Sequence, residues 1–175
     1  EIGGKPILWH IMKIYSAHGI NDFIICCGYK GYLIKEYFSN YFLHTSDVTF
    51  SLNDNSVEIH NKRSEPWRVT LVDTGEHAMT GSRIKQLQPY IGEESFCVTY
   101  GDGLSNVNIE KELDFHNRHN KIATLVGVNP PSRFGELVIG KDNNVSEFIE
   151  KAETSGTQGF INGGFYILNK EVFEY

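Results

Sequence analysis

The strongest constraint on the fold of this chain is an apolar run that ends at an acid. Residues Phe96 to Tyr100 lead directly into Gly101-Asp102-Gly103. A short run without polar interruptions is typical of a β-strand buried on both faces. In open α/β sheets, ligands bind beyond the carboxyl ends of the strands, where glycines let phosphates and sugars approach the backbone. Asp102 is therefore a candidate metal ligand, although a plain Gly-Asp-Gly turn explains the same residues equally well.

The sequence before this strand alternates between helical and strand patterns. Pro6 suits the first turn of a helix, and the apolar residues after it recur at helical spacing until about Gly19. The apolar run 22–27 predicts a buried strand, and residues 33–41 return to helical spacing. Such alternation favours an α/β fold with a parallel sheet.

Two segments have the period-two pattern of β-hairpins, residues 47–60 and 136–150. Further strands are expected at 67–72, 122–128 and 164–168. Helices are expected near 84–87 and at 109–119, the second with Asn108 as its N-cap. Asn169 is the expected cap of a last helix. No internal repeat or linker divides the chain, so we expect one α/β domain over residues 1–175 with hairpins appended to it.

Composition narrows the class of protein. The 175 residues are 40% hydrophobic, enough for one domain with a core. A formal net charge of −6 argues against binding to nucleic acid through its phosphates, although a local basic pocket for a small anion remains compatible. No stretch approaches the ~20 apolar residues that span a bilayer, and no signal-peptide pattern is present. With three cysteines that suggest core residues and no disulfide framework, we expect a cytoplasmic protein.

Three loops carry candidate binding residues. Thr80, Gly81 and Arg83 lie just before or within a predicted helix, where N–H groups and a guanidinium favour an anion or a polar base edge. Glu150 and Lys151 end a hairpin strand and suit a sugar hydroxyl and a phosphate. Asn162-Gly163-Gly164 precede an apolar strand and suggest close backbone approach to a ligand. The plainer explanations are a solvated turn, a surface charge pair and a β-bulge, respectively.

Other chemistry finds less support in the sequence. His116 and His119 lie three residues apart on a predicted helix, but no third ligand with zinc-like spacing accompanies them, so we interpret them as surface residues. No nucleophile elbow, phosphate-binding P-loop or dinucleotide fingerprint is present.

Several segments together resemble the sugar-1-phosphate nucleotidyltransferases. They are residues 1–10 (EIGGKPILWH), 26–31 (CCGYKG), 73–75 (DTG), 79–81 (MTG), 100–103 (YGDG), 133–135 (RFG), 148–151 (FIEK) and 161–165 (INGGF). The loop 73–81 and Glu65-Pro66-Trp67 look like the branch that uses CTP. The resemblance covers the whole chain and implies a Rossmann-like three-layer fold with a mixed, mostly parallel central sheet.

The resemblance also implies an activity and its residues. The reaction would transfer a cytidylyl group from CTP to α-D-glucose 1-phosphate, giving CDP-glucose and diphosphate for dideoxy sugars of bacterial O-antigens. Catalysis in such a transfer comes from alignment and charge neutralisation, with Mg²⁺ bridging phosphates. Asp102 would be the catalytic Mg²⁺ ligand, and the substrates would meet Thr80, Arg83, Gly101, Gly135, Glu150, Lys151, Asn162 and Gly163.

Two features of the family lie outside this sequence, namely an opening strand with a Gly-Gly-x-Gly-Thr-Arg loop and a second metal-binding aspartate. We therefore expect a chain truncated at both ends, with negligible turnover by itself, because the triphosphate lacks most of its N–H donors. The resemblance further implies homo-oligomers. The alternatives are a relative that uses dTTP or UTP, a non-catalytic sugar-nucleotide-binding domain, and a glycosyltransferase.

Overall fold

The fold comes from a computed structural model that describes residues 1–61, 64–129, 136–140, 143–149 and 160–175. The helices are α1 (Ile7–Ser16), α2 (Gly31–Ser39), α3 (Tyr41–Thr45), α4 (Thr80–Gln86) and α5 (Ile109–His119), with short 3₁₀ turns η1 (Gln88–Tyr90) and η2 (Lys170–Glu174). The strands are β1 (Asp22–Cys27), β2 (Asp47–Ser51), β3 (Ser56–His60), β4 (Arg68–Asp73), β5 (Phe96–Thr99), β6 (Ala123–Val128), β7 (Glu136–Ile139), β8 (Val145–Ile149) and β9 (Ile161–Leu168). The predicted alternation of helices and strands is confirmed.

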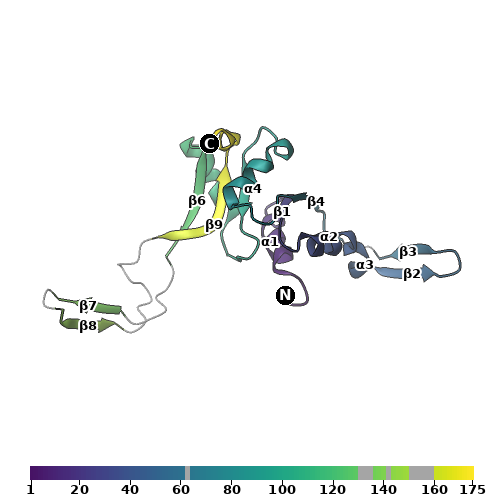
Figure 1. Cartoon of the computed structure of the whole chain (residues 1–175), viewed down its shortest axis with the longest axis horizontal. Coiled ribbons are helices and arrows are strands. Elements are labelled where there is room, and N and C mark those ends of the chain that lie inside the picture. Colours follow the sequence, from purple (N-terminus) through teal and green to yellow (C-terminus); the bar gives the residue numbers. More distant parts are fainter. Residues whose placement is uncertain (62–63, 130–135, 141–142, 150–159) are drawn as a thin grey trace.

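Two sheets form the body of the molecule (Figure 1). In the first, β1 pairs with β4 in parallel, with Asp22 opposite Arg68 and Cys27 opposite Asp73. In the second, β9 lies between β5 and β6 and runs antiparallel to both. The expected single, mostly parallel sheet is therefore not formed by the described residues alone.

The second sheet shows why the sequence pattern suggested parallel neighbours. Since β5 and β6 are both antiparallel to β9, they run in the same direction, and α5 connects them as a crossover helix. The order strand, helix, strand predicts a parallel pair. A strand from far along the chain has been inserted between the two, which local periodicity cannot reveal.

Helix α1 joins the two sheets through the core. Its Ile11 and Tyr15 are buried together with Ile109 of α5 and Phe165 of β9. Phe23 of β1 and Cys97 of β5 are among the half-buried residues that pack against this cluster. The apolar face predicted for residues 7–15 thus covers elements of both sheets.

The two predicted hairpins are confirmed, and in Figure 1 they extend away from the body. One is β2 with β3 and the other is β7 with β8. In the first, Val48 faces Ile59 and Phe50 faces Val57 across the strands, so one face is apolar. The helix predicted over 33–41 is two helices in the structure, because the backbone leaves helical geometry at Asn40, which lies between α2 and α3.

Two polar side chains differ from their predictions. Asn169 stands at the N-cap position of η2 as expected, but its side chain makes no capping bond; its Oδ1 instead accepts hydrogen bonds from Ser95 Oγ (2.6 Å) and from His116 Nε2 (2.8 Å). His116 is not a surface residue, because it is only 2% exposed and its Nδ1 lies 2.8 Å from Thr124 Oγ1. The sequence predicted that His116 lies on a helix. Its burial depends on the sheet that packs against α5, which helical spacing does not reveal.

Other expectations agree with the structure. Asn108 caps α5, because its Oδ1 accepts a hydrogen bond from the Lys111 N–H. All three cysteines have free thiols, and Cys27 is buried. In the part of the chain that the structure describes, none of the helices is long and apolar enough to cross a membrane.

Candidate active site

The acid that the sequence singles out lies on an exposed turn. β5 ends at Thr99, and the next four residues, Tyr100 to Gly103, are all exposed. Within the described residues, the Asp102 carboxylate has no hydrogen bond and no ion pair. The same residues contain no group of three or more His, Cys, Asp or Glu side chains arranged around a metal site. A single free carboxylate suits Mg²⁺, which keeps several waters and takes the rest of its ligands from substrate phosphates.

The start of β9 lies beside this turn. Thr99 faces Phe165 in the ladder, and its Oγ1 donates a 2.9 Å hydrogen bond to the Gly164 carbonyl. Gly164 has a φ of +78°, and a Cβ there would lie 2.9 Å from Tyr100 Cδ2. A side chain at residue 164 would therefore be strained and would push the Tyr100 ring away. The structure thus brings the predicted residues 162–164 next to the turn that carries Asp102.

The paired glycines also have a structural role. Leu125 of β6 pairs with Tyr166 of β9, and Gly127 pairs with Asn162. The two pairs are two residues apart on β6 but four residues apart on β9, so β9 bulges between Asn162 and Tyr166. A Cβ at Gly163 would lie 2.9 Å from the Val126 carbonyl oxygen of β6. The β-bulge given as the plainer explanation is present, and the close backbone approach is to the protein's own strands.

Three polar side chains meet beside the bulge. The Asn162 Oδ1 accepts a 2.8 Å hydrogen bond from the Gly164 N–H, and its Nδ2 donates to the Tyr166 hydroxyl. The hydroxyls of Tyr166 and Tyr100 are 3.0 Å apart, with the rings edge to face. Sequence reasoning missed both tyrosines. The alternation of side chains along β9, which puts Asn162 and Tyr166 on one face, was the available signal.

The second predicted loop is organised around Arg83. Its Nη1 donates to Thr74 Oγ1 (2.6 Å) and to the Cys27 carbonyl (3.3 Å), and its Nη2 donates to the Glu76 carbonyl (3.1 Å). Cys27 ends β1 and Thr74 follows β4, so one guanidinium joins the carboxyl ends of both strands to α4. A Cβ at Gly28 would lie 2.8 Å from both terminal nitrogens, so a side chain at residue 28 would displace the guanidinium from this position.

This contact pattern leaves Arg83 limited capacity for a ligand. A guanidinium has five N–H groups, and three of the five are used in the bonds just described. Thr74, which receives the shortest bond, is 3% exposed and itself donates to the Cys27 carbonyl (3.0 Å). Thr80, the first residue of α4, is exposed. The three remaining predicted residues, Gly135, Glu150 and Lys151, lie outside the described residues.

Sequence comparison places the chain in a family. The profile of the nucleotidyl transferases matches residues 1–175. The chain belongs to this family.

Particular relatives narrow the comparison. The chain is 58% identical over 175 residues to the glucose-1-phosphate cytidylyltransferase of Salmonella typhimurium, with 99% of this chain and 67% of the relative covered. It is 42% identical over 174 residues to the probable glucose-1-phosphate cytidylyltransferase of Bacillus subtilis, with 99% of this chain and 66% of the relative covered. The chain thus spans about two thirds of the length of these relatives.

The fold is similar to that of a solved relative. The crystal structure of HddC from Yersinia pseudotuberculosis superposes with a TM-score of 0.63 at 25% identity, covering 100% of this chain and 68% of HddC. Together with the family match, this establishes an α/β nucleotidyltransferase fold.

Proposed function

We propose that this chain transfers a cytidylyl group from CTP to α-D-glucose 1-phosphate, giving CDP-glucose and diphosphate. The observation that carries the proposal is the 58% identity over 99% of the chain to the glucose-1-phosphate cytidylyltransferase of Salmonella typhimurium. The turn at Asp102 supports it, because an exposed carboxylate beyond the end of a sheet strand is a suitable place for two phosphorylated reactants to meet around a cation.

In this proposal, Asp102 holds Mg²⁺. The carboxylate fits that role, since it is exposed and has no partner in the described part of the chain. Bound there, Mg²⁺ would offset the negative charge of the phosphates. The protein's own task is alignment, so that an oxygen of the sugar phosphate lies in line with the α-phosphorus and diphosphate leaves on the opposite side.

The other predicted residues divide by substrate. Thr80 and Arg83 would line the nucleotide, with Arg83 also holding the loop after β4 in place. Glu150 and Lys151 would meet the sugar and its phosphate. Gly101, Gly135, Asn162 and Gly163 would form the wall of the pocket.

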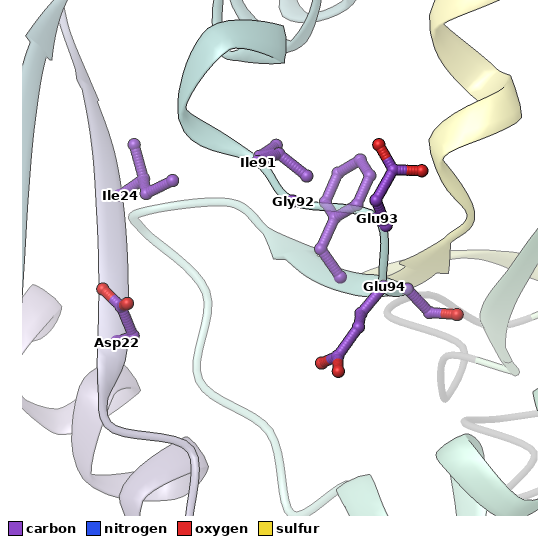
Figure 2. A pocket seen from close by; sticks show the side chains of 8 residues that line it. Asp22, Ile24, Ile91, Gly92, Glu93 and Glu94 are labelled. Carbon is purple, nitrogen blue, oxygen red and sulfur yellow. The ribbon is translucent and has the colours of Figure 1, made fainter.

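We also propose that the two sheets of the body belong to one mixed central sheet. β1 and β5 are apolar runs with the pattern of interior strands, yet each has a free edge among the described pairings. An open pocket of about 510 Å³ lies between them, lined by Asp22 and Ile24 of β1 and by residues 91–96 (Figure 2). Helix α1 packs on both strands.

The test of the function is an assay of the complete protein with Mg²⁺, glucose 1-phosphate and each of CTP, dTTP and UTP. We expect CDP-glucose from CTP, with kcat/KM at least about 10-fold higher than with the other two nucleotides, a difference of ~1.4 kcal/mol. A preference for dTTP or UTP would contradict the proposed nucleotide. Binding of sugar nucleotides without turnover would indicate a non-catalytic domain instead.

The resemblance also implies that the protein forms homo-oligomers. This stays a prediction, and a measurement of molecular mass in solution tests it.

A further inference from the structure

We propose that Tyr166 and Tyr100 form a hydrogen-bond relay in which Tyr166 orients the Tyr100 hydroxyl as a donor to an oxygen atom of a substrate bound at the Asp102 turn. Tyr100 is then a binding residue and Tyr166 a positioning residue. This inference rests on the proposed function and adds two residues to its site.

The orientation of the Asn162 amide fixes the first step of the relay. Its Oδ1 must face the Gly164 N–H, because that group is a donor 2.8 Å away. Its Nδ2 therefore faces the Tyr166 oxygen and donates to it. The reverse orientation would place an N–H against an N–H. The amide is thus held in one direction by the backbone of the bulge.

The second step follows from the first. A hydroxyl that accepts a hydrogen bond becomes a better donor, since bonds in a chain polarise one another. Tyr166 accepts from Asn162, so its own proton points to the Tyr100 oxygen 3.0 Å away. The hydrogen bond with Tyr100 is also the main cause that raises the pKa of Tyr166.

The last donor of the relay faces outward. The Tyr100 oxygen accepts from Tyr166 and also lies 3.5 Å from the Asn162 Nδ2, so Tyr100 keeps its own proton for another acceptor. Tyr100 is 40% exposed, whereas Tyr166 is half-buried. Its ring is held against Gly164, where no side chain intervenes. An oriented donor, two residues before Asp102, is therefore presented to the side on which the substrates are proposed to bind.

The acceptor is an oxygen of either the sugar phosphate or the nucleotide, and separate affinities for the two substrates distinguish them. We expect Tyr166→Phe, which removes only the middle hydroxyl, to raise KM for one substrate by about 3–10-fold, the range of a neutral hydrogen bond. The kcat should change by less than about 2-fold, because the lost bond is present in ground state and transition state alike.

The design is a double-mutant cycle. Tyr100→Phe should raise the same KM, and the double variant should be no worse than Tyr100→Phe alone, because both hydroxyls act through one donor. Tyr90→Phe, at a tyrosine that is 55% exposed on η1, is the matched control and should leave both KM values unchanged. Unfolding temperatures of all variants show whether each remains folded.

Two results would overturn the relay: unchanged KM values for both substrates in Tyr166→Phe, or additive effects in the double variant. Calorimetric affinities for CTP and for glucose 1-phosphate provide the same comparison without turnover. A protein that binds both substrates but forms no CDP-glucose would contradict the proposed function, while the relay would still be decided by those affinities.

Discussion

The two described loops that carry candidate site residues use their polar side chains in opposite ways. After β5, the Asp102 carboxylate is exposed, and the described part of the chain offers it no partner. After β4, the Arg83 guanidinium donates three hydrogen bonds to groups of the protein itself. The difference teaches how to tell the two roles of a charged side chain apart. A side chain with unused hydrogen-bonding groups, such as Asp102, is available to a ligand, whereas one whose groups already bond the protein, such as Arg83, mainly stabilises its own segment.

Asp102→Asn should have the largest effect of the substitutions considered, and the effect should be on catalysis and not on stability. The change keeps the shape of the side chain but removes the charge that would hold Mg²⁺, so kcat/KM should fall by about 10²–10³, a loss typical of one electrostatic group. The unfolding temperature should change by less than about 2 °C, because no described bond is lost. Steady-state kinetics and thermal unfolding of the complete protein provide both numbers. Retained activity in this variant would contradict a role for Asp102 in catalysis.

Arg83→Ala should show the opposite pattern, with stability affected first. The buried Thr74 hydroxyl and the Cys27 carbonyl lose a charged donor, which costs about 2–3 kcal/mol of unfolding free energy. In a domain of this size, that corresponds to roughly 4–12 °C in unfolding temperature. The control is Lys35→Ala, at an exposed position of α2. Lys85→Ala is unsuitable as a control, because the Lys85 ammonium donates a hydrogen bond to the Phe173 carbonyl. An Arg83→Ala protein of normal stability that has lost CTP binding would break the comparison.

Gly164→Ala tests whether the turn at Asp102 depends on the bulge in β9. The φ of +78° and the approach of 2.9 Å to the Tyr100 ring both oppose a Cβ. We expect a loss of about 1–3 kcal/mol in unfolding free energy, the cost of forcing a residue into that backbone region. Gly92→Ala, which meets no atom within 4 Å and has no positive φ, is the control, and its unfolding free energy should stay nearly constant. Equal stability of the two variants would show that residue 164 tolerates a side chain.

Glu112→Gln should have the smallest effect of these substitutions. Glu112 is a buried carboxyl group, in contrast to the exposed carboxylate of Asp102. Burial raises the pKa of Glu112, and the nearby His116 opposes this in part. The folded state therefore favours the protonated form, and the charge of Glu112 lowers stability at neutral pH. We expect Glu112→Gln to raise the unfolding temperature at pH 7.5 by about 2–4 °C, which is ~1 kcal/mol.

The pH dependence supplies the check on this prediction. The gain from Glu112→Gln should disappear as the pH falls below the ordinary pKa of a glutamate, about 4.3, because the wild-type carboxyl is then protonated in both states. Glu110→Gln, at an exposed position in the same first turn of α5, is the control without a burial effect. A gain that persists at pH 3.5 would assign the effect to something other than the charge.

Local sequence predicted the individual elements well. The apolar patterns identified α1 and β1, Asn108 marked the start of α5, and the alternation at 47–60 identified the hairpin of β2 and β3. Local sequence also identified Asp102, because a carboxylate that follows an apolar run and stands between two glycines is a pattern of neighbouring residues. The contact of Arg83 with the Cys27 carbonyl and that of His116 with Asn169 were missed, since these partners are 56 and 53 residues away in the sequence.

The sequence by itself determined which segments are helices and strands, and which residue types stand at their ends. These properties follow from the periodicity of side chains and from backbone preferences, which act over a few neighbouring residues. The tertiary structure alone decided that β9 lies between β5 and β6 and that Tyr166 meets Tyr100. Those choices depend on contacts between distant segments, which are made only when the chain folds and buries its apolar surface.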